Sequence, residues 1–300
     1  MSKQQKTATA GTALIILTAL LWSTAGAGIK YVPADAAAVA AVRCLIAGLV
    51  FLPLARLREL KPSPRLLLLG ASYTLMTASF VVANKWTTAL NAVAIQYTAP
   101  LWIFAGAVAL GAVKLNFRRA APMLLIAAGI AVFLQEPKTG SSLAGNLAAL
   151  VSGVGFALVI ISFRLLRKEQ NYSLVSFANL FAALILLPVM IAGGGVLQLA
   201  ALPVSGWAGL AYLGAVQIGL AYALYAAGLK RVTALRASTL SLIEPVLSPV
   251  WTFLLFAEFP TSHGQIGAAI IIAAILLDLR LNPEANQKEP LASGPERPAA

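Results

Sequence analysis

The sequence predicts an all-α, polytopic membrane protein with ten transmembrane helices, arranged as two inverted repeats of five helices each. Three observations predict this class. Of the 300 residues, 60% are hydrophobic and 11% are charged, whereas soluble proteins have about 45–50% apolar and about 25% charged residues. The apolar residues gather in ten stretches that show no strand-like alternation. Features of the first five stretches recur in the same order in the last five.

The ten stretches have lengths typical of membrane-spanning helices. A helix rises about 1.5 Å per residue, so about 20 residues cross a bilayer. The predicted spans are 11–30, 34–54, 66–84, 90–113, 119–135, 143–164, 173–192, 207–229, 234–256 and 264–280.

The first stretch has features of a cleavable signal peptide, because two lysines precede it and Ala25-Gly26-Ala27 follows its core. However, it has a counterpart 134 residues later. The matching positions are Gly11 with Gly145, Trp22 with Phe156, and Lys30 with Arg164. Removing the stretch would leave one repeat incomplete, so we expect it to be retained as helix 1.

Helices 4 and 9 each carry a proline about halfway along, and Pro100 and Pro245 lie 145 residues apart. Proline removes a backbone donor and kinks a helix. Further matches are Pro53 with Pro188 at an offset of 135, and Lys85 with Lys230 at 145. Broken helices at matching positions of two repeats indicate a transporter binding site near the membrane midplane.

The repeats also predict how the chain is divided. We expect an N-terminal segment over 1–10, repeats over 11–138 and 139–281, and a disordered tail over 282–300, which is rich in Pro, Glu, Ala and Ser. Because five is an odd number, the second repeat enters the membrane from the opposite side.

The positions of Lys and Arg predict the orientation of the chain. All 22 of them, except Lys30, Arg43, Lys85 and Lys138, fall in the termini and in alternate linkers. Cytoplasmic linkers carry an excess of these residues. We therefore expect both termini to be cytoplasmic.

The composition also argues against several functions. A net charge of +12 could suggest nucleic acid, but the basic residues form no single patch. With one cysteine, Cys44, and one histidine, His263, the chain has no disulfide pair and no His/Cys metal site. It shows no acidic pair, no nucleophile with a base and no phosphate loop. We expect no catalytic residues, no metal, no cofactor and no nucleic-acid partner.

The candidate binding residues lie on a few helix faces. Helix 3 carries one polar and aromatic stripe, and helix 8 carries an overlapping one. Helix 4 has polar and aromatic residues around its proline, and helices 1 and 6 each have a central aromatic. These residues are Tyr73, Thr77, Phe80 and Asn84; Gln217, Tyr222 and Tyr225; Gln96, Tyr97, Pro100 and Trp102; and Trp22 and Phe156. They could line a cavity, or they could join packed helices by hydrogen bonds and ring contacts.

Two charged residues lie within predicted spans, Arg43 in helix 2 and Glu244 directly before Pro245. Intramembrane charges are costly and mark functional sites by default. Glu244 could bind a substrate amine, carry a proton or support the bundle. Arg43 could serve as a fixed charge in the bundle.

These features resemble the EamA-type, ten-helix branch of the drug/metabolite transporter superfamily. The resemblance rests on Trp22 and Lys30 in helix 1, Arg43, the two proline-centred helices, and the helix-9 ending Phe256-Ala257-Glu258. The first half departs from the pattern, since Ala112-Val113-Lys114 has no glutamate. Within this branch the chain is most similar to bacterial exporters of amino acids, including aromatic ones.

The resemblance implies an inner-membrane exporter of amino acids or related metabolites that works by alternating access. Its partners would be a small-molecule substrate and the lipid bilayer, and a monomer is one possible oligomeric state. Another carrier of the superfamily, for organic cations, sugars or nucleosides, is the alternative. A channel is less favoured, because no selectivity filter or ring of charges is visible.

Overall fold

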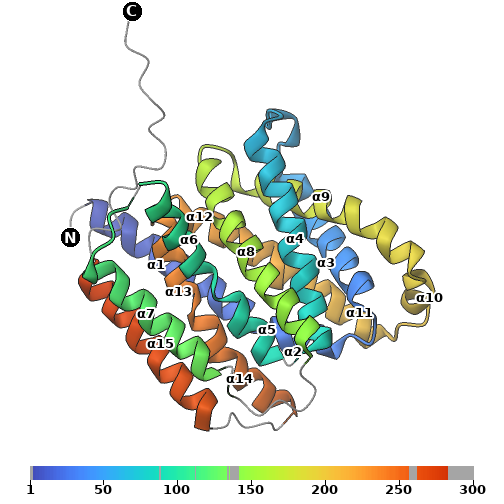
Figure 1. The fold of residues 1–300 in the computed structure, drawn as a ribbon. Helices are drawn as coiled ribbons and strands as arrows, with labels where there is room; N and C mark the ends of the chain where they lie inside the picture. Colours follow the sequence, from blue (N-terminus) through green and yellow to red (C-terminus); the bar gives the residue numbers. More distant parts are fainter. Residues whose placement is uncertain are drawn as a thin grey trace, which may run out of the picture.

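The structure, a computed structural model, describes residues 3–87, 89–111, 113–133, 135, 142–256 and 262–282. Within this part every regular element is a helix, as predicted (Figure 1). The first half contains α1 (Lys3–Trp22), α2 (Ala25–Tyr31), α3 (Ala36–Phe51), η1 (Leu52–Leu54), η2 (Leu57–Glu59), α4 (Pro64–Trp86), α5 (Ala89–Gln96), α6 (Ala99–Ala109) and α7 (Phe117–Phe133).

The second half contains α8 (Leu143–Leu165), α9 (Asn171–Ala192), α10 (Gly195–Ala200), α11 (Val204–Ala211), η3 (Tyr212–Leu220), α12 (Ala221–Leu229), α13 (Ala234–Ser241), α14 (Ile243–Phe256) and α15 (Ser262–Leu281). Each of the ten predicted stretches corresponds to one helix or to consecutive helices of the described chain. The short helix α10 and the 3-10 turns η1 and η2 were not predicted.

Polar residues begin several of these helices. Asp35 caps α3, and its Oδ1 accepts a hydrogen bond from the Ala38 N–H at 2.7 Å. Ser63, Ser142 and Thr233 cap α4, α8 and α13 in the same way. Such side chains satisfy backbone donors that a helix leaves free at its start. The starts of these helices therefore follow from local sequence.

Three predicted helices are interrupted within the described residues. Helix 4 breaks between α5 and α6, just before Pro100, and helix 9 breaks at Leu242, just before Pro245. The proline expectation is confirmed at both places. Helix 1 also breaks, at Ser23 and Thr24, without a proline, and it begins at Lys3 rather than at residue 11.

Seven helical segments of the described chain are long and apolar enough to cross a membrane by themselves. The other predicted spans correspond to α7, which has 17 residues, to the interrupted pair α13 and α14, and to α15, whose apolar stretch is Gln265–Asp278. These three spans are shorter, or are interrupted by a break.

The helices pack as a two-fold relation between the repeats requires. Helix 2 packs against its counterpart helix 7 (α3 with α9), and helix 5 against helix 10 (α7 with α15), a pair that lies side by side in Figure 1. A contact between two helices that are not counterparts should occur twice. Helix 3 packs along helix 6 (α4 with α8), and the equivalent helix 8 packs along helix 1 (α12 with α1). These contacts between the halves therefore agree with a two-fold relation.

The same symmetry holds for single hydrogen bonds. Thr18 Oγ1 donates to the Ala221 carbonyl at 3.2 Å, and Ser152 Oγ donates to the Met76 carbonyl at 3.1 Å. Thr18 and Ser152 are 134 residues apart, and Met76 and Ala221 are 145 apart, which are the offsets found in the sequence. The two bonds are equivalent under the repeat.

The linkers lie at the two ends of the helix bundle, and linkers at the same end contact each other. At one end, the Arg56 N–H donates to Ser173, and Lys230 donates to the Glu169 carbonyl at 2.6 Å. At the other end, Asp35 accepts a hydrogen bond from Gln198 at 2.8 Å, and Lys85 donates to the Val32 carbonyl at 3.0 Å. The linkers predicted to share a side of the membrane therefore lie together.

Candidate functional site

A small enclosed cavity lies between the repeats, with lining residues from both halves. Helices 1 to 4 contribute Trp22, Arg43, Met76, Thr77, Phe80 and Gln96, and helices 6, 8 and 9 contribute Phe156, Gln217, Ile218, Tyr222 and Glu244. The space open to the centres of water molecules is about 30 Å³, which is room for about two waters. All of the lining residues are buried, so the protein is closed around this site.

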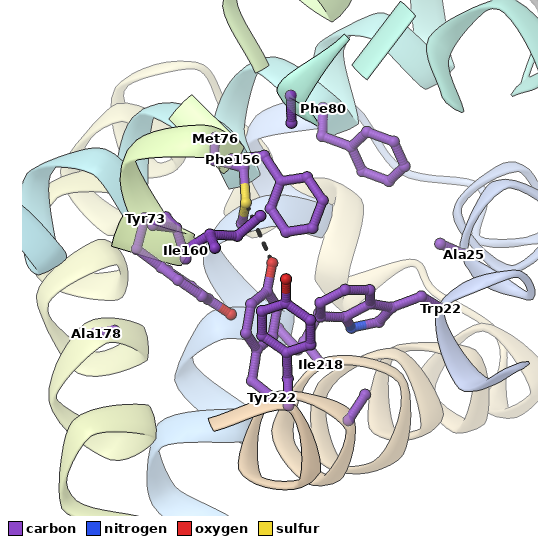
Figure 2. Packing of buried hydrophobic residues seen from close by; sticks show 14 of the residues in the cluster. Trp22, Ala25, Tyr73, Met76, Phe80, Phe156, Ile160, Ala178, Ile218 and Tyr222 are labelled. Atoms are coloured by element: carbon purple, nitrogen blue, oxygen red, sulfur yellow. Dashed lines mark hydrogen bonds between the residues drawn. The ribbon is translucent and has the colours of Figure 1, made fainter. Parts of the chain in front are cut away.

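Aromatic rings make one wall of the cavity. Trp22 packs edge-on against Phe156, with ring centroids 5.4 Å apart, and against Tyr222 at 4.8 Å. Figure 2 shows Phe156 and Tyr222 close to Met76, whose sulfur accepts a hydrogen bond from the Tyr222 hydroxyl at 3.1 Å. Contacts of this kind contribute about 0.5–1.5 kcal/mol each beyond burial. They hold the wall in one arrangement.

Two charged side chains are buried at the cavity, Arg43 with 2% of its surface exposed and Glu244 with 3%. Arg43 lies midway along α3, and its Nη2 donates to Thr77 Oγ1 at 2.6 Å. Glu244 lies at the start of α14, where the helix break places it beside Tyr97, whose hydroxyl donates to Glu244 Oε2.

Several buried polar atoms at the cavity have no hydrogen-bond partner among the described residues. They are Nε and Nη1 of Arg43, Nε1 of Trp22 and Oε1 of Gln217. Leaving such an atom buried and unpaired costs about 1–3 kcal/mol, and more for a charged group. Polar groups that stay unpaired at a cavity are therefore available to a bound solute.

Eight of the predicted binding residues line the cavity, namely Trp22, Thr77, Phe80, Gln96, Phe156, Gln217, Tyr222 and Glu244. The expected stripe on helix 3 is divided. Thr77 and Phe80 reach the cavity, whereas Tyr73 donates to Asn179 Oδ1 at 3.0 Å and Asn84 donates to the Phe80 carbonyl at 2.9 Å.

The other predicted residues are placed behind the cavity or away from it. Tyr97 does not line the cavity, but its hydroxyl donates a hydrogen bond to Glu244, which does. Tyr225 is fully buried and packs against Trp22, with ring centroids 4.8 Å apart. Pro100 is buried at the helix break. Trp102 is 44% exposed and its indole N–H donates to Thr98, so the expectation that it faces the cavity is not met.

Arg43, Met76 and Ile218 line the cavity but were not among the predicted binding residues. Arg43 had a sequence signal, because it is a charge within a span. Ile218 follows Gln217 in η3, a π-helical segment of nine residues. The wider π turn shifts the helix face that α-helical spacing predicts, and such turns often occur at functional sites.

Gly214, also in η3, explains how helix 8 approaches helix 2. A Cβ atom there would lie 2.6 Å from the Ile46 Cβ and 2.8 Å from the Arg43 carbonyl oxygen. Only a residue without a side chain fits at that distance, as is common where membrane helices meet. This close contact sets Gln217 and Arg43 around the same cavity.

Secondary transporters with inverted repeats bind their substrates between the two halves of the helix bundle, where this cavity lies. The chain belongs to the EamA-like transporter family, which it matches over residues 9–135 and 143–279. It is thus a multi-pass membrane transporter and not an enzyme. The helix-9 ending at Ala257 and Glu258 and the position of Ala112, which entered the resemblance, lie outside the described residues.

The chain is also similar to a curated protein and to a solved structure. The chain is 29% identical over 273 residues to an uncharacterized transporter of Archaeoglobus fulgidus, covering 90% of this chain and 96% of that protein. A solved crystal structure is similar with a TM-score of 0.73 at 21% identity, covering 92% of this chain and 98% of the other. The second likeness concerns the fold alone.

Proposed function

We propose that this protein exports amino acids or related small metabolites from the cytoplasm by alternating access through the cavity between its repeats. The observation that carries the proposal is the set of unpartnered buried polar atoms on Arg43, Trp22 and Gln217. A polar solute would supply their hydrogen bonds, whereas lipid would not. The aromatic wall would hold its apolar part.

Substrate binding requires the closed cavity to widen. The volume of about 30 Å³ is too small for an amino acid, so the halves must move apart on one side at a time. Contacts between small residues and backbone suit such motion. A Cβ at Gly155, for example, would lie 3.0 Å from the backbone of Met76, so α8 and α4 touch at that point without an interlocking side chain.

An organic cation is the second candidate substrate. Glu244 lies at the same cavity as the rings of Trp22, Phe156 and Tyr222, and such rings attract cations. Arg43 opposes this candidate, because a cation would leave its guanidinium unpaired beside a like charge.

The test is uptake by proteoliposomes that contain the purified protein. The panel consists of labelled phenylalanine, leucine, lysine, glucose, uridine and tetraethylammonium. We expect saturable uptake and counterflow of amino acids, and little uptake of glucose or uridine. Uptake of tetraethylammonium alone would favour the second candidate, and flux that does not saturate would contradict a carrier.

A further inference from the structure

The two buried charges at the cavity come from opposite repeats and have no counterparts in the other half. Arg43 of α3 corresponds to Ala178 at an offset of 135, and Glu244 of α14 corresponds to Ala99 at an offset of 145. The main helix contacts between the halves nevertheless follow the two-fold relation. The cavity therefore carries one positive and one negative side chain that the repeat does not duplicate.

Within the described chain the two charges do not neutralise each other. No ion pair joins Arg43 to Glu244, and the Nε and Nη1 atoms of Arg43 have no partner. Glu244 accepts one hydrogen bond, from Tyr97 to Oε2, and none of the described groups donates to its Oε1. Each charge thus keeps hydrogen-bonding capacity at the cavity.

Neutral partners hold both charges in place instead. Thr77 binds Nη2 of Arg43 at 2.6 Å, and Tyr97 binds Glu244. A buried charge without a counter-charge is costly. A ligand that brings both missing counter-charges at once would offset this cost at both positions.

We propose that Arg43 and Glu244 bind the two ends of a zwitterionic α-amino acid, Arg43 its carboxylate and Glu244 its ammonium group. Arginine is the preferred partner of carboxylates because its planar fork of donors matches their geometry. The unpartnered Trp22 N–H can donate to the carboxylate, and the Gln217 Oε1 can accept from the ammonium. This assignment rests on the proposed function and deepens it.

The surrounding rings define the rest of the ligand. Trp22, Phe80, Phe156 and Tyr222 line the same cavity, so an apolar or aromatic side chain would fit the substrate best. A third charge on the ligand would find no described counter-charge there. The ligand class is therefore a neutral zwitterion with an apolar side chain.

The test compares three ligands that share the phenylalanine skeleton and differ in charge. They are L-phenylalanine, its amide, which keeps only the ammonium, and N-acetyl-L-phenylalanine, which keeps only the carboxylate. Binding to the purified protein is measured by calorimetry. We expect wild type to bind phenylalanine at least about tenfold more tightly than either analogue, since hydrogen bonds to charged groups are the strong ones.

Two variants should change this preference in opposite ways. Arg43→Gln should weaken phenylalanine and the N-acetyl analogue by at least about tenfold and leave the amide within about threefold of wild type. Glu244→Gln should weaken phenylalanine and the amide and leave the N-acetyl analogue unchanged. If Arg43→Gln does not fold, Thr77→Val removes the side-chain partner of Arg43 and should weaken the same two ligands.

Matched controls are Arg236→Gln and Asp278→Asn, which alter buried charges that do not line the cavity. Both should keep the wild-type order of the three ligands. An equal loss for all three ligands in Arg43→Gln and in Glu244→Gln would overturn the proposal. So would wild-type binding of the amide or the N-acetyl analogue as tight as that of phenylalanine.

The outcome also separates this proposal from the proposed function. Transport of free amino acids together with equal binding of all three ligands overturns the charge assignment alone. If no amino acid is bound or transported, both are overturned.

Discussion

Trp22 and Trp102 have similar sequence contexts but opposite surroundings in the structure. Both lie inside predicted spans near a helix break. Trp22 is 3% exposed and contacts the rings of Phe156 and Tyr222, whereas Trp102 is 44% exposed on the surface of the bundle. Only the first can contact a solute in the cavity.

We therefore expect Trp102→Ala to transport within about twofold of wild type. Trp22→Ala should lower transport at least about tenfold at equal expression, because its ring contacts with Phe156, Tyr222 and Tyr225 are lost, each worth about 0.5–1.5 kcal/mol. Initial uptake rates in proteoliposomes provide the measurement. A comparable loss in both variants would contradict this placement of the two rings.

The helices approach each other most closely where glycine replaces a side chain. A Cβ at Gly145 in α8 would lie 2.8 Å from the Trp86 carbonyl carbon and 2.9 Å from the Thr87 nitrogen. The repeat-related Gly11 would meet the Arg231 Cβ at 2.6 Å. Helices 6 and 1 are thus held against the ends of helices 3 and 8.

Gly145→Ala should lower the stability of the protein by about 1–3 kcal/mol, because backbone atoms cannot yield to the added methyl group. Gly106→Ala is the matched control, since nothing lies within 4 Å of a Cβ at that helical position. There alanine should be neutral or stabilise the helix by about 0.5–1 kcal/mol. Thermal unfolding in detergent measures both; a stable Gly145→Ala protein would rule out the tight contact.

In the whole molecule, the linkers divide into two groups that lie at opposite ends. The linkers at one end, which include the linker with Arg58, are rich in basic residues. The linkers at the other end, which include the linker just before α11, are poor in them. Since cytoplasmic linkers carry the excess of Lys and Arg, we propose that the basic end is cytoplasmic. The export direction depends on this orientation.

Single cysteines test the orientation in a Cys44→Ala background, which removes the native thiol. Cysteine at the exposed position Ser205 should react with an impermeant thiol reagent in intact cells. Cysteine at the exposed position Arg58 should react only after permeabilisation. Labelling of Arg58→Cys in intact cells would reverse the orientation and the proposed export.

The sequence by itself determined the class of fold, the repeat and the two proline breaks. Each of them can be read from the order of residues along the chain, without knowing how the helices pack. Hydropathy over about 20 residues identifies a span, a missing N–H interrupts a helix wherever proline occurs, and equal offsets along the chain reveal a duplication. Resemblance to the family then added the class of transporter, which the family match confirmed.

Only the tertiary structure decided which side chains share the cavity. Spacing placed Tyr73, Thr77, Phe80 and Asn84 on one face, but the packing of α4 against α8 and α9 brought only the middle two to the cavity. The close packing of η3 against α3 placed Arg43 there as well. The rotation of a helix about its axis depends on all its neighbours at once, because in a bilayer its outward face can be as apolar as its inward face.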